Sequence, residues 1–260
     1  MAFTRKRARS TTKDQAETMC RNDVNSSTIE VFSFSNLETP YTVHKGLISR
    51  EARDVTRKLE GHDNVIKIEP QPLLVFLAWL YLGRICRPQN DLSDTISYAV
   101  HHGPHPKTEI LQDYHLADTF IFAQENGLHK LKNDVMTQLI LQHEETGHAV
   151  ADDAQDVVRK TLGIKNSFSE FAIIAEARYI RNTTVNMKEI LEFRNDHRLA
   201  QQLDMSTTHD PSECECAKLA RAEPDKRICY FHEHHSPCQI TACRRRLRAL
   251  GAPNQVVDDE

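Results

Sequence analysis

The sequence predicts an α+β fold that is mainly helical and carries a small three-stranded sheet near its N-terminus. The chain has only 8 Gly and 10 Pro among 260 residues, which is low for an architecture of many strands and turns. Apolar residues recur at helical spacing over much of the chain, whereas three short β-prone runs all occur before residue 69. A chain of this length forms one or two domains and can bury a core without disulfides.

The three β-prone runs define the predicted sheet. The first, over residues 28–34, changes the parity of its apolar residues at Phe32, which indicates either a strand covered on both faces or a β-bulge. Turn-forming residues at 35–40 separate it from a second run at 41–43, so a β-hairpin is the simplest interpretation. One or two helices follow, and the third strand covers residues 65–68.

A buried central helix is predicted over residues 73–82, because this stretch is apolar all round and Gly83 follows it. The next stretch, over residues 87–108, is rich in Pro, His and other polar residues. It predicts a long polar connection with at most a short helix near residues 93–99.

Helical spacing then returns. Residues 111–126 and 128–144 predict two antiparallel helices joined by a short turn. A helical extension over residues 150–204 is expected to pack against them. Within this extension a capping box at residues 167–170 begins an amphipathic helix, and a further helix is expected around Met187.

Four sequence blocks occur in a fixed order along the body of the chain. They are Val43-His44-Lys45-x-Leu47 after a strand, Phe76-x-x-x-Leu80-Tyr81-x-Gly83, Leu116-Ala117-Asp118, and Lys132-Asn133-x-Val135. Together they resemble the BTB/POZ domain family, in the divergent form abundant in filamentous fungi, over residues 28–146. The resemblance implies a three-stranded sheet capped by helical hairpins, built for protein–protein contact and without a catalytic centre.

The resemblance also implies partners. Members of the family commonly form homodimers, and some act as substrate adaptors on cullin-based ubiquitin ligases. A homodimer would use the N-terminal region and the helix from His44, with Leu47 and Ile48 in the interface or in the core beneath it. Cullin recruitment has less support, because no apolar residue stands two positions before a Glu between Gly83 and Glu109.

Four motifs typical of enzymes are absent from the sequence: Gly-x-Ser-x-Gly, a Walker loop, a dinucleotide-binding Gly-rich turn and His-Glu-x-x-His. The adjacent pair His44 and Lys45 does not form an acid–base couple, since neighbouring residues on a helix do not face one another. We therefore predict a non-enzymatic interaction module that homodimerises or recruits a partner, with a ubiquitin-ligase substrate adaptor as one form of recruitment.

Charge separates the N-terminal end from the body. Residues 1–27 have almost no large apolar side chain and predict a disordered basic tail, in which residues 5–9 could act as a nuclear localisation signal. Residues 29–148 are acidic and the chain has a net charge of −4, so nucleic acid is not expected as a partner. No apolar run approaches the roughly 18 residues that cross a bilayer, so we expect no membrane contact and an intracellular location, in the nucleus or cytoplasm.

The C-terminal segment, residues 205–260, is rich in Cys and His and is expected to be partly disordered. Five of the seven Cys lie in it, and their crowding with His favours metal binding in a reducing compartment over disulfides. The candidate ligands of a structural zinc are Cys229, His232 and Cys238 with either His234 or Cys216. The spacing matches no standard zinc finger, so thiols without metal in a poorly ordered tail are the other interpretation.

A second function is compatible with this segment. A nuclear transcription-associated regulator could use the zinc-binding segment together with the basic run at residues 244–248. Such a protein would need a salt-sensitive affinity for DNA, which the near-balanced charge of the C-terminal part does not favour.

Overall fold

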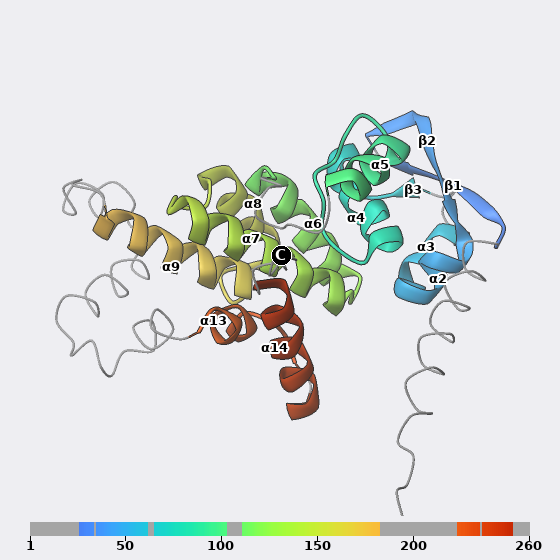
Figure 1. Ribbon diagram of the computed structural model, residues 1–260. Coiled ribbons are helices and arrows are strands. Elements are labelled where there is room, and N and C mark those ends of the chain that lie inside the picture. The colour runs from blue at the N-terminus through green and yellow to red at the C-terminus, as the bar shows by residue number, and fades with distance from the viewer. Residues whose placement is uncertain are drawn as a thin grey trace, which may run out of the picture.

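The computed structural model has the mainly helical α+β architecture that the sequence predicts (Figure 1). The sheet lies at one end of the molecule, and the two C-terminal helices lie against the central helices. The structure describes residues 26–33, 35–61, 65–102, 111–182, 223–234 and 236–251. The basic run at residues 5–9, the helix expected around Met187, and Cys216 lie outside these residues.

The sheet has the strand order β2-β1-β3. β1 (Thr28–Ser33) pairs antiparallel with β2 (Asn36–His44) and parallel with the short strand β3 (Val65–Ile66). The register shifts between the pairs Val31–Tyr41 and Ser33–Asn36, which leaves the extra residues on β2. Burial alternates along β1, so its change of apolar parity at Phe32 is not a bulge in this strand. The parallel strands β1 and β3 need a long connection between them. This connection consists of β2 and of the helical segment that follows it.

The helical segment consists of two short helices, α2 (Lys45–Glu51) and α3 (Arg53–Gly61). Ala52 separates them, because it is fully buried and leaves the helical region at φ −140° and ψ 57°. Leu47 and Ile48 of α2 point into the core, where burial of their side chains holds the helical segment on the sheet.

α4 (Pro70–Leu82) is the predicted central helix, and residues 72–80 are all buried. Phe76 packs against Phe122, with 5.0 Å between ring centroids and an angle of 60° between the ring planes. Gly83 ends the helix at φ 66°, a left-handed conformation that favours glycine. Within the described residues, neither α4 nor any other helix is both long and apolar enough to span a membrane.

α5 (Leu92–His102) is longer than the short helix predicted within the polar connection. The Asp91 carboxylate accepts a hydrogen bond from the backbone N–H of Asp94 at 2.7 Å, which satisfies an otherwise unpaired donor at the helix start. Leu92, Thr95 and Ala99 are buried along one face. Because one of the three is polar and one is small, the face gives little apolar signal in the sequence.

α6 (Asp113–Glu125) and α7 (His129–Thr146) form the predicted antiparallel helical hairpin. The turn between them contains Gly127 at φ 64°. At the other end of the hairpin the Asp113 carboxylate accepts a hydrogen bond from Gln142 at 2.8 Å and lies 2.8 Å from His143 Nε2. These contacts fix the end of α7 beside the start of α6.

Two helices of the predicted extension pack on this hairpin. α8 (Asp152–Leu162) lies against α6, and α9 (Ser167–Asn182) lies against α7 and α8. The aromatic rings of Phe120 and Phe168 meet at 5.4 Å between centroids. Both side chains are fully buried, so the extension shares one core with the body.

The structure also contains two helices that the sequence patterns did not indicate, α13 (Pro224–Tyr230) and α14 (Pro237–Gly251). They pack against each other, and α13 contacts α7 (Figure 1). Ile228, Phe231 and Leu247 join the core from this C-terminal hairpin. Part of the Cys- and His-rich segment is therefore folded.

Candidate metal centre in the C-terminal hairpin

The C-terminal hairpin places two Cys residues and two His residues close together. Cys229 lies in the last turn of α13, and its side chain is buried beside Ile228. The chain then reverses direction through a short segment that carries His232 and His234, and α14 returns with Cys243 one turn and a half after its start. This reversal brings side chains from α13, from the connecting segment and from α14 close together.

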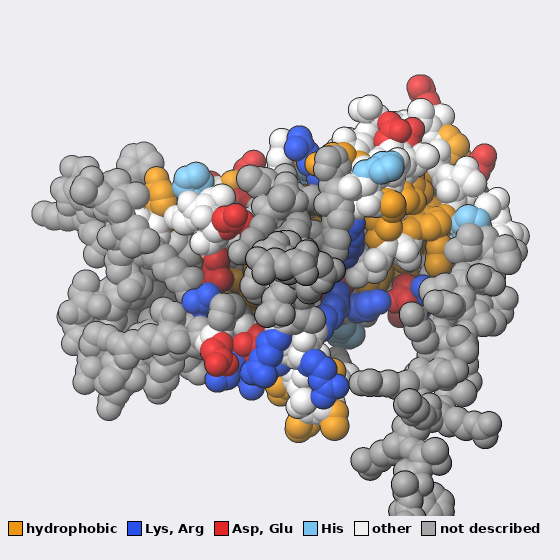
Figure 2. Space-filling model, viewed as in Figure 1, with side chains coloured by type: hydrophobic (Ala, Val, Ile, Leu, Met, Phe, Trp, Pro, Cys, Tyr) orange, Lys and Arg blue, Asp and Glu red, His pale blue; other side chains and the backbone are white. Residues whose placement is uncertain are grey.

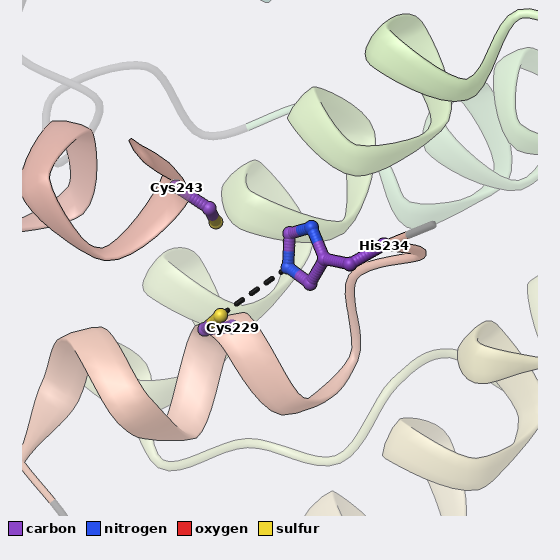
Figure 3. A group of neighbouring side chains, drawn as sticks. All are labelled: Cys229, His234 and Cys243. Atoms are coloured by element: carbon purple, nitrogen blue, oxygen red, sulfur yellow. Dashed lines mark hydrogen bonds between the residues drawn. The ribbon is translucent and has the colours of Figure 1, made fainter. Parts of the chain in front are cut away.

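Cys229, His234 and Cys243 form a group that could hold a metal ion (Figure 3). One ligand atom from each residue lies within 4.8 Å of the other two. Cys229 Sγ and His234 Nε2 are 3.2 Å apart. Thiolate sulfur and imidazole nitrogen are the ligands that tetrahedral Zn²⁺ favours in proteins.

His232 lies at the edge of this group. Its Nδ1 is 3.1 Å from Cys243 Sγ, and its Nε2 is 3.0 Å from Thr137 Oγ1 on α7. Burial, together with the positive charges of His234 and Arg246, lowers the pKa of His232 to about 3. The imidazole is therefore neutral near pH 7, the form that can ligate a metal.

The thiol of Cys243 is held in its protonated form by its surroundings. Burial, followed by the neighbouring Cys229, raises the pKa of Cys243 to about 12. A metal ion acts in the opposite direction, because its charge stabilises the thiolate and displaces the proton.

Polar contacts to α7 hold the segment between the two helices in place. The Glu233 backbone N–H donates to Asn133 Oδ1 at 3.0 Å, and Asn133 Nδ2 donates to the Glu233 carbonyl at 3.1 Å. The Glu233 carboxylate pairs with Lys132 and lies 2.9 Å from His129 Nδ1. Burial alone would raise the pKa of Glu233, but the hydrogen bonds from Lys132 and His129 lower it below its ordinary value.

A second link connects α14 to the centre of the molecule. Arg246 pairs with the Asp134 carboxylate on α7 at 2.9 Å, and Trp79 Nε1 on α4 donates to the same carboxylate at 2.9 Å. Burial raises the pKa of Asp134, although Arg246 and Trp79 oppose this shift. A cavity of about 430 Å³ lies between α7 and the hairpin and includes His232, Cys243 and Arg246 in its lining.

The structure brings together some of the predicted ligands and replaces one. Cys229 and His234 belong to the group, and His232 adjoins it. Cys238 is exposed in the first turn of α14 and lies outside the group, where Cys243 supplies the second sulfur. The spacing of Ile240, Cys243 and Leu247, three and four residues apart, is the helical signal that could have indicated Cys243.

The residues predicted for a dimer interface lie where α2 meets α4. Leu47 and Ile48 are in the core, which is the second of the two positions expected for them. His44 is half-buried, its Nδ1 lies 2.8 Å from Tyr81 Oη, and its backbone N–H donates to the same oxygen.

Comparisons with protein-family models, curated proteins and solved structures found no match for this chain.

Proposed function

We propose that this protein is a non-enzymatic interaction module of the BTB/POZ type that forms homodimers or recruits a partner protein. The observation that supports it most is that separate blocks of the resemblance contact one another. His44 of the first block bonds to Tyr81 of the second. Trp79 and Asp134, which bond to each other, lie at unspecified positions within the second and fourth blocks. Residues that a family retains as a fold signature are expected to meet in this way.

The buried polar groups of the body serve packing in this proposal. The Asp113 carboxylate contacts Gln142 and His143 of α7, and it also accepts a hydrogen bond from the Ala151 backbone N–H at 2.8 Å. One carboxylate thus joins α6, α7 and the start of α8. In this proposal the Asp113–His143 pair links α6 to α7 and does not act as an acid–base couple.

A second copy of the chain is the partner that we propose first. β2 forms an outer strand of the sheet, and Leu37 on it is 58% exposed. An outer strand presents backbone donors and acceptors that another chain can pair with. Homodimerisation would protect this edge and cover the exposed side chain.

Light scattering on the full chain over a range of micromolar concentrations tests the proposal. We expect a dimer for the wild type and a shift toward monomer for Leu37→Glu, because a charge would be buried in the interface. Ile164→Glu is the matched control, since Ile164 is 52% exposed in the segment between α8 and α9 and should leave the dimer intact. A wild-type chain that stays monomeric at high micromolar concentration contradicts the homodimer. Co-purification with a cullin scaffold would instead favour the adaptor role.

The second candidate function is a nuclear regulator with a zinc-binding C-terminal segment. The Cys–His–Cys group supports it, and Figure 2 shows Lys and Arg side chains gathered over α13 and α14. Two of these arginines are engaged, since Arg246 pairs with Asp134 and Arg248 pairs with Asp225. The basic surface is thereby partly neutralised. A duplex-DNA affinity that falls steeply between low and physiological salt would favour this function over the interaction module.

A further inference from the structure

Two sulfur–nitrogen pairs face one another across the turn of the C-terminal hairpin. Cys229 Sγ is 3.2 Å from His234 Nε2, and Cys243 Sγ is 3.1 Å from His232 Nδ1. In a tetrahedral zinc site with ordinary bond lengths, sulfur and nitrogen ligand atoms lie about 3.6 Å apart. Both pairs are therefore within about half an ångström of the separation that a shared Zn²⁺ requires.

The hydrogen bonds of Thr137 determine which nitrogen of His232 carries the proton. The Thr137 hydroxyl donates to the Asn133 carbonyl at 2.9 Å, so its single proton is already used. It can then only accept from His232 Nε2, 3.0 Å away, which must carry the N–H. The lone pair of His232 is left on Nδ1, the nitrogen that faces Cys243.

We propose that Cys229, His232, His234 and Cys243 bind one structural Zn²⁺ ion. Two sulfurs and two imidazoles complete a tetrahedral set, and all four positions are supplied by the chain, which leaves none open for catalysis. Binding releases the two thiol protons, so the two thiolates neutralise the charge of the ion. Burial of a net charge is costly, so a metal site without net charge is compatible with the burial of Cys229 and the partial burial of the other three residues. His232 moves toward the other three ligands in this site, because it lies at the edge of their group.

Thr137 has a defined role in this site. A His that binds a metal through one nitrogen usually donates its other N–H to a protein oxygen, which orients the ring. Thr137 Oγ1 is that oxygen for His232, and it is a positioning residue rather than a ligand. Since Thr137 lies on α7, the metal site joins the hairpin to the body of the protein.

The proposed zinc would hold the C-terminal hairpin in its position against α7. Glu233 lies between the two His ligands and bonds to Lys132 and Asn133, so fixing both His residues also fixes these contacts with α7. The Phe231 ring next to the same ligands packs on Phe171 of α9 at 5.4 Å between centroids. Loss of the metal is expected to loosen the hairpin and expose this aromatic pair.

Metal analysis of the full chain, purified without a His tag and supplied with Zn²⁺, tests the proposal. We expect one zinc per chain, and Co²⁺ in its place should give the intense visible absorption of tetrahedral cobalt with thiolate ligands. Cys243→Ser should lose the metal. Cys238→Ser is the matched control from the same hairpin, and it should bind zinc as the wild type does, since Cys238 is exposed and outside the group.

Two threonine variants test the site without removing a ligand. Thr137→Val should weaken zinc binding by about 10- to 100-fold in competition with a chromogenic chelator, because His232 loses its orienting contact. Thr241→Val is its control, since the Thr241 hydroxyl likewise bonds to the carbonyl four residues earlier but is exposed on α14. Equal affinities for the two variants would exclude the role of Thr137 and of the Nδ1-bound His232.

Two results would overturn the zinc site as a whole. One is less than one zinc per two chains after incubation with excess Zn²⁺, and the other is an equal loss of metal in the Cys238 and Cys243 variants. The proposal does not depend on the proposed interaction function, because metal content and oligomeric state are measured separately.

Discussion

Asp134 illustrates how a single side chain holds the helical layers together. Its carboxylate on α7 accepts from Trp79 of α4 and pairs with Arg246 of α14. The sequence shows Asp134 only as one charge among many on an amphipathic helix. Its role depends on two residues that are 55 and 112 positions away, so sequence spacing alone could not indicate it.

Replacement of this carboxylate should destabilise the protein. Asp134→Ala leaves the buried Trp79 N–H without its acceptor and Arg246 without its partner, and we expect a loss of about 2 kcal/mol in the free energy of unfolding. Urea unfolding followed by Trp79 fluorescence measures this, since it is the only Trp in the chain. Asp156→Ala removes an exposed carboxylate that contacts Lys160 at 3.9 Å, and it should cost less than about 0.5 kcal/mol. An equal loss of unfolding free energy in the two variants would contradict the role of Asp134 in linking α4, α7 and α14.

Asp118 is a carboxylate whose environment lowers stability at neutral pH. Burial, followed by the nearby Glu69, raises the pKa of Asp118 from 3.8 to about 6. The folded protein therefore binds more protons than the unfolded chain between about pH 4 and pH 6, and its stability decreases as pH rises through this window. Above pH 6 the charged carboxylate remains half-buried in the folded state.

Asp118→Asn should remove this pH-dependent cost. We expect the variant to be about 1 kcal/mol more stable than the wild type at pH 7, a value reduced for the partial exposure of the side chain. Near pH 4 the difference should disappear, because the wild-type carboxyl group is then protonated in the folded state. Urea unfolding at the two pH values measures both quantities. A stability difference that does not change with pH would show that Asp118 is not the titrating group.

At the scale of elements, the sequence predicts best the helices that bury a continuous apolar face. α4 is apolar from Leu73 to Leu82, and the hairpin of α6 and α7 keeps its helical spacing up to a Gly-containing turn, so both follow from local patterns. β1 and β3 lie within the predicted β-prone runs, but β2 begins at Asn36, inside the residues that were expected to form the turn. Their pairing order was not predictable, since β3 pairs with β1 only through a crossover of two helices.

The C-terminal hairpin lacks such a pattern for a physical reason. Its contribution to the core is limited to a few side chains, among them Ile228, Phe231 and Leu247, and its contacts with α7 are mostly ion pairs and hydrogen bonds. A helix held by polar contacts from another part of the chain has a weak apolar period. Of the predicted zinc ligands, Cys229 and His234 lie in the Cys–His–Cys group, whereas Cys238 lies outside it. The weak helical spacing around Cys243 was the sequence feature that separates it from Cys238.

At the scale of the molecule, three packed units share a core: the sheet with its helices through α7, the pair α8 and α9, and the C-terminal hairpin. Aromatic contacts join the first to the second through Phe120 and Phe168, and the second to the third through Phe171 and Phe231. Because these rings are buried, each unit removes apolar surface of its neighbour from water. The packing of each unit on its neighbour therefore determines which apolar surface a shortened chain would expose.

Shortened chains should show a graded exposure of this core. A chain that ends after Thr146 keeps α7 complete and should retain the sheet, but it loses Phe168 and exposes Phe120 on α6. We expect it to bind a hydrophobic dye several-fold more strongly than the full chain and to associate at micromolar concentration. A chain that ends after residue 222 keeps α8 and α9 and should show a smaller increase, since Phe171 is then the aromatic residue that loses its cover. Dye fluorescence and light scattering on the two chains measure the effect. Equal dye binding by the full chain and the chain ending after Thr146 would mean that the extension does not cover α6.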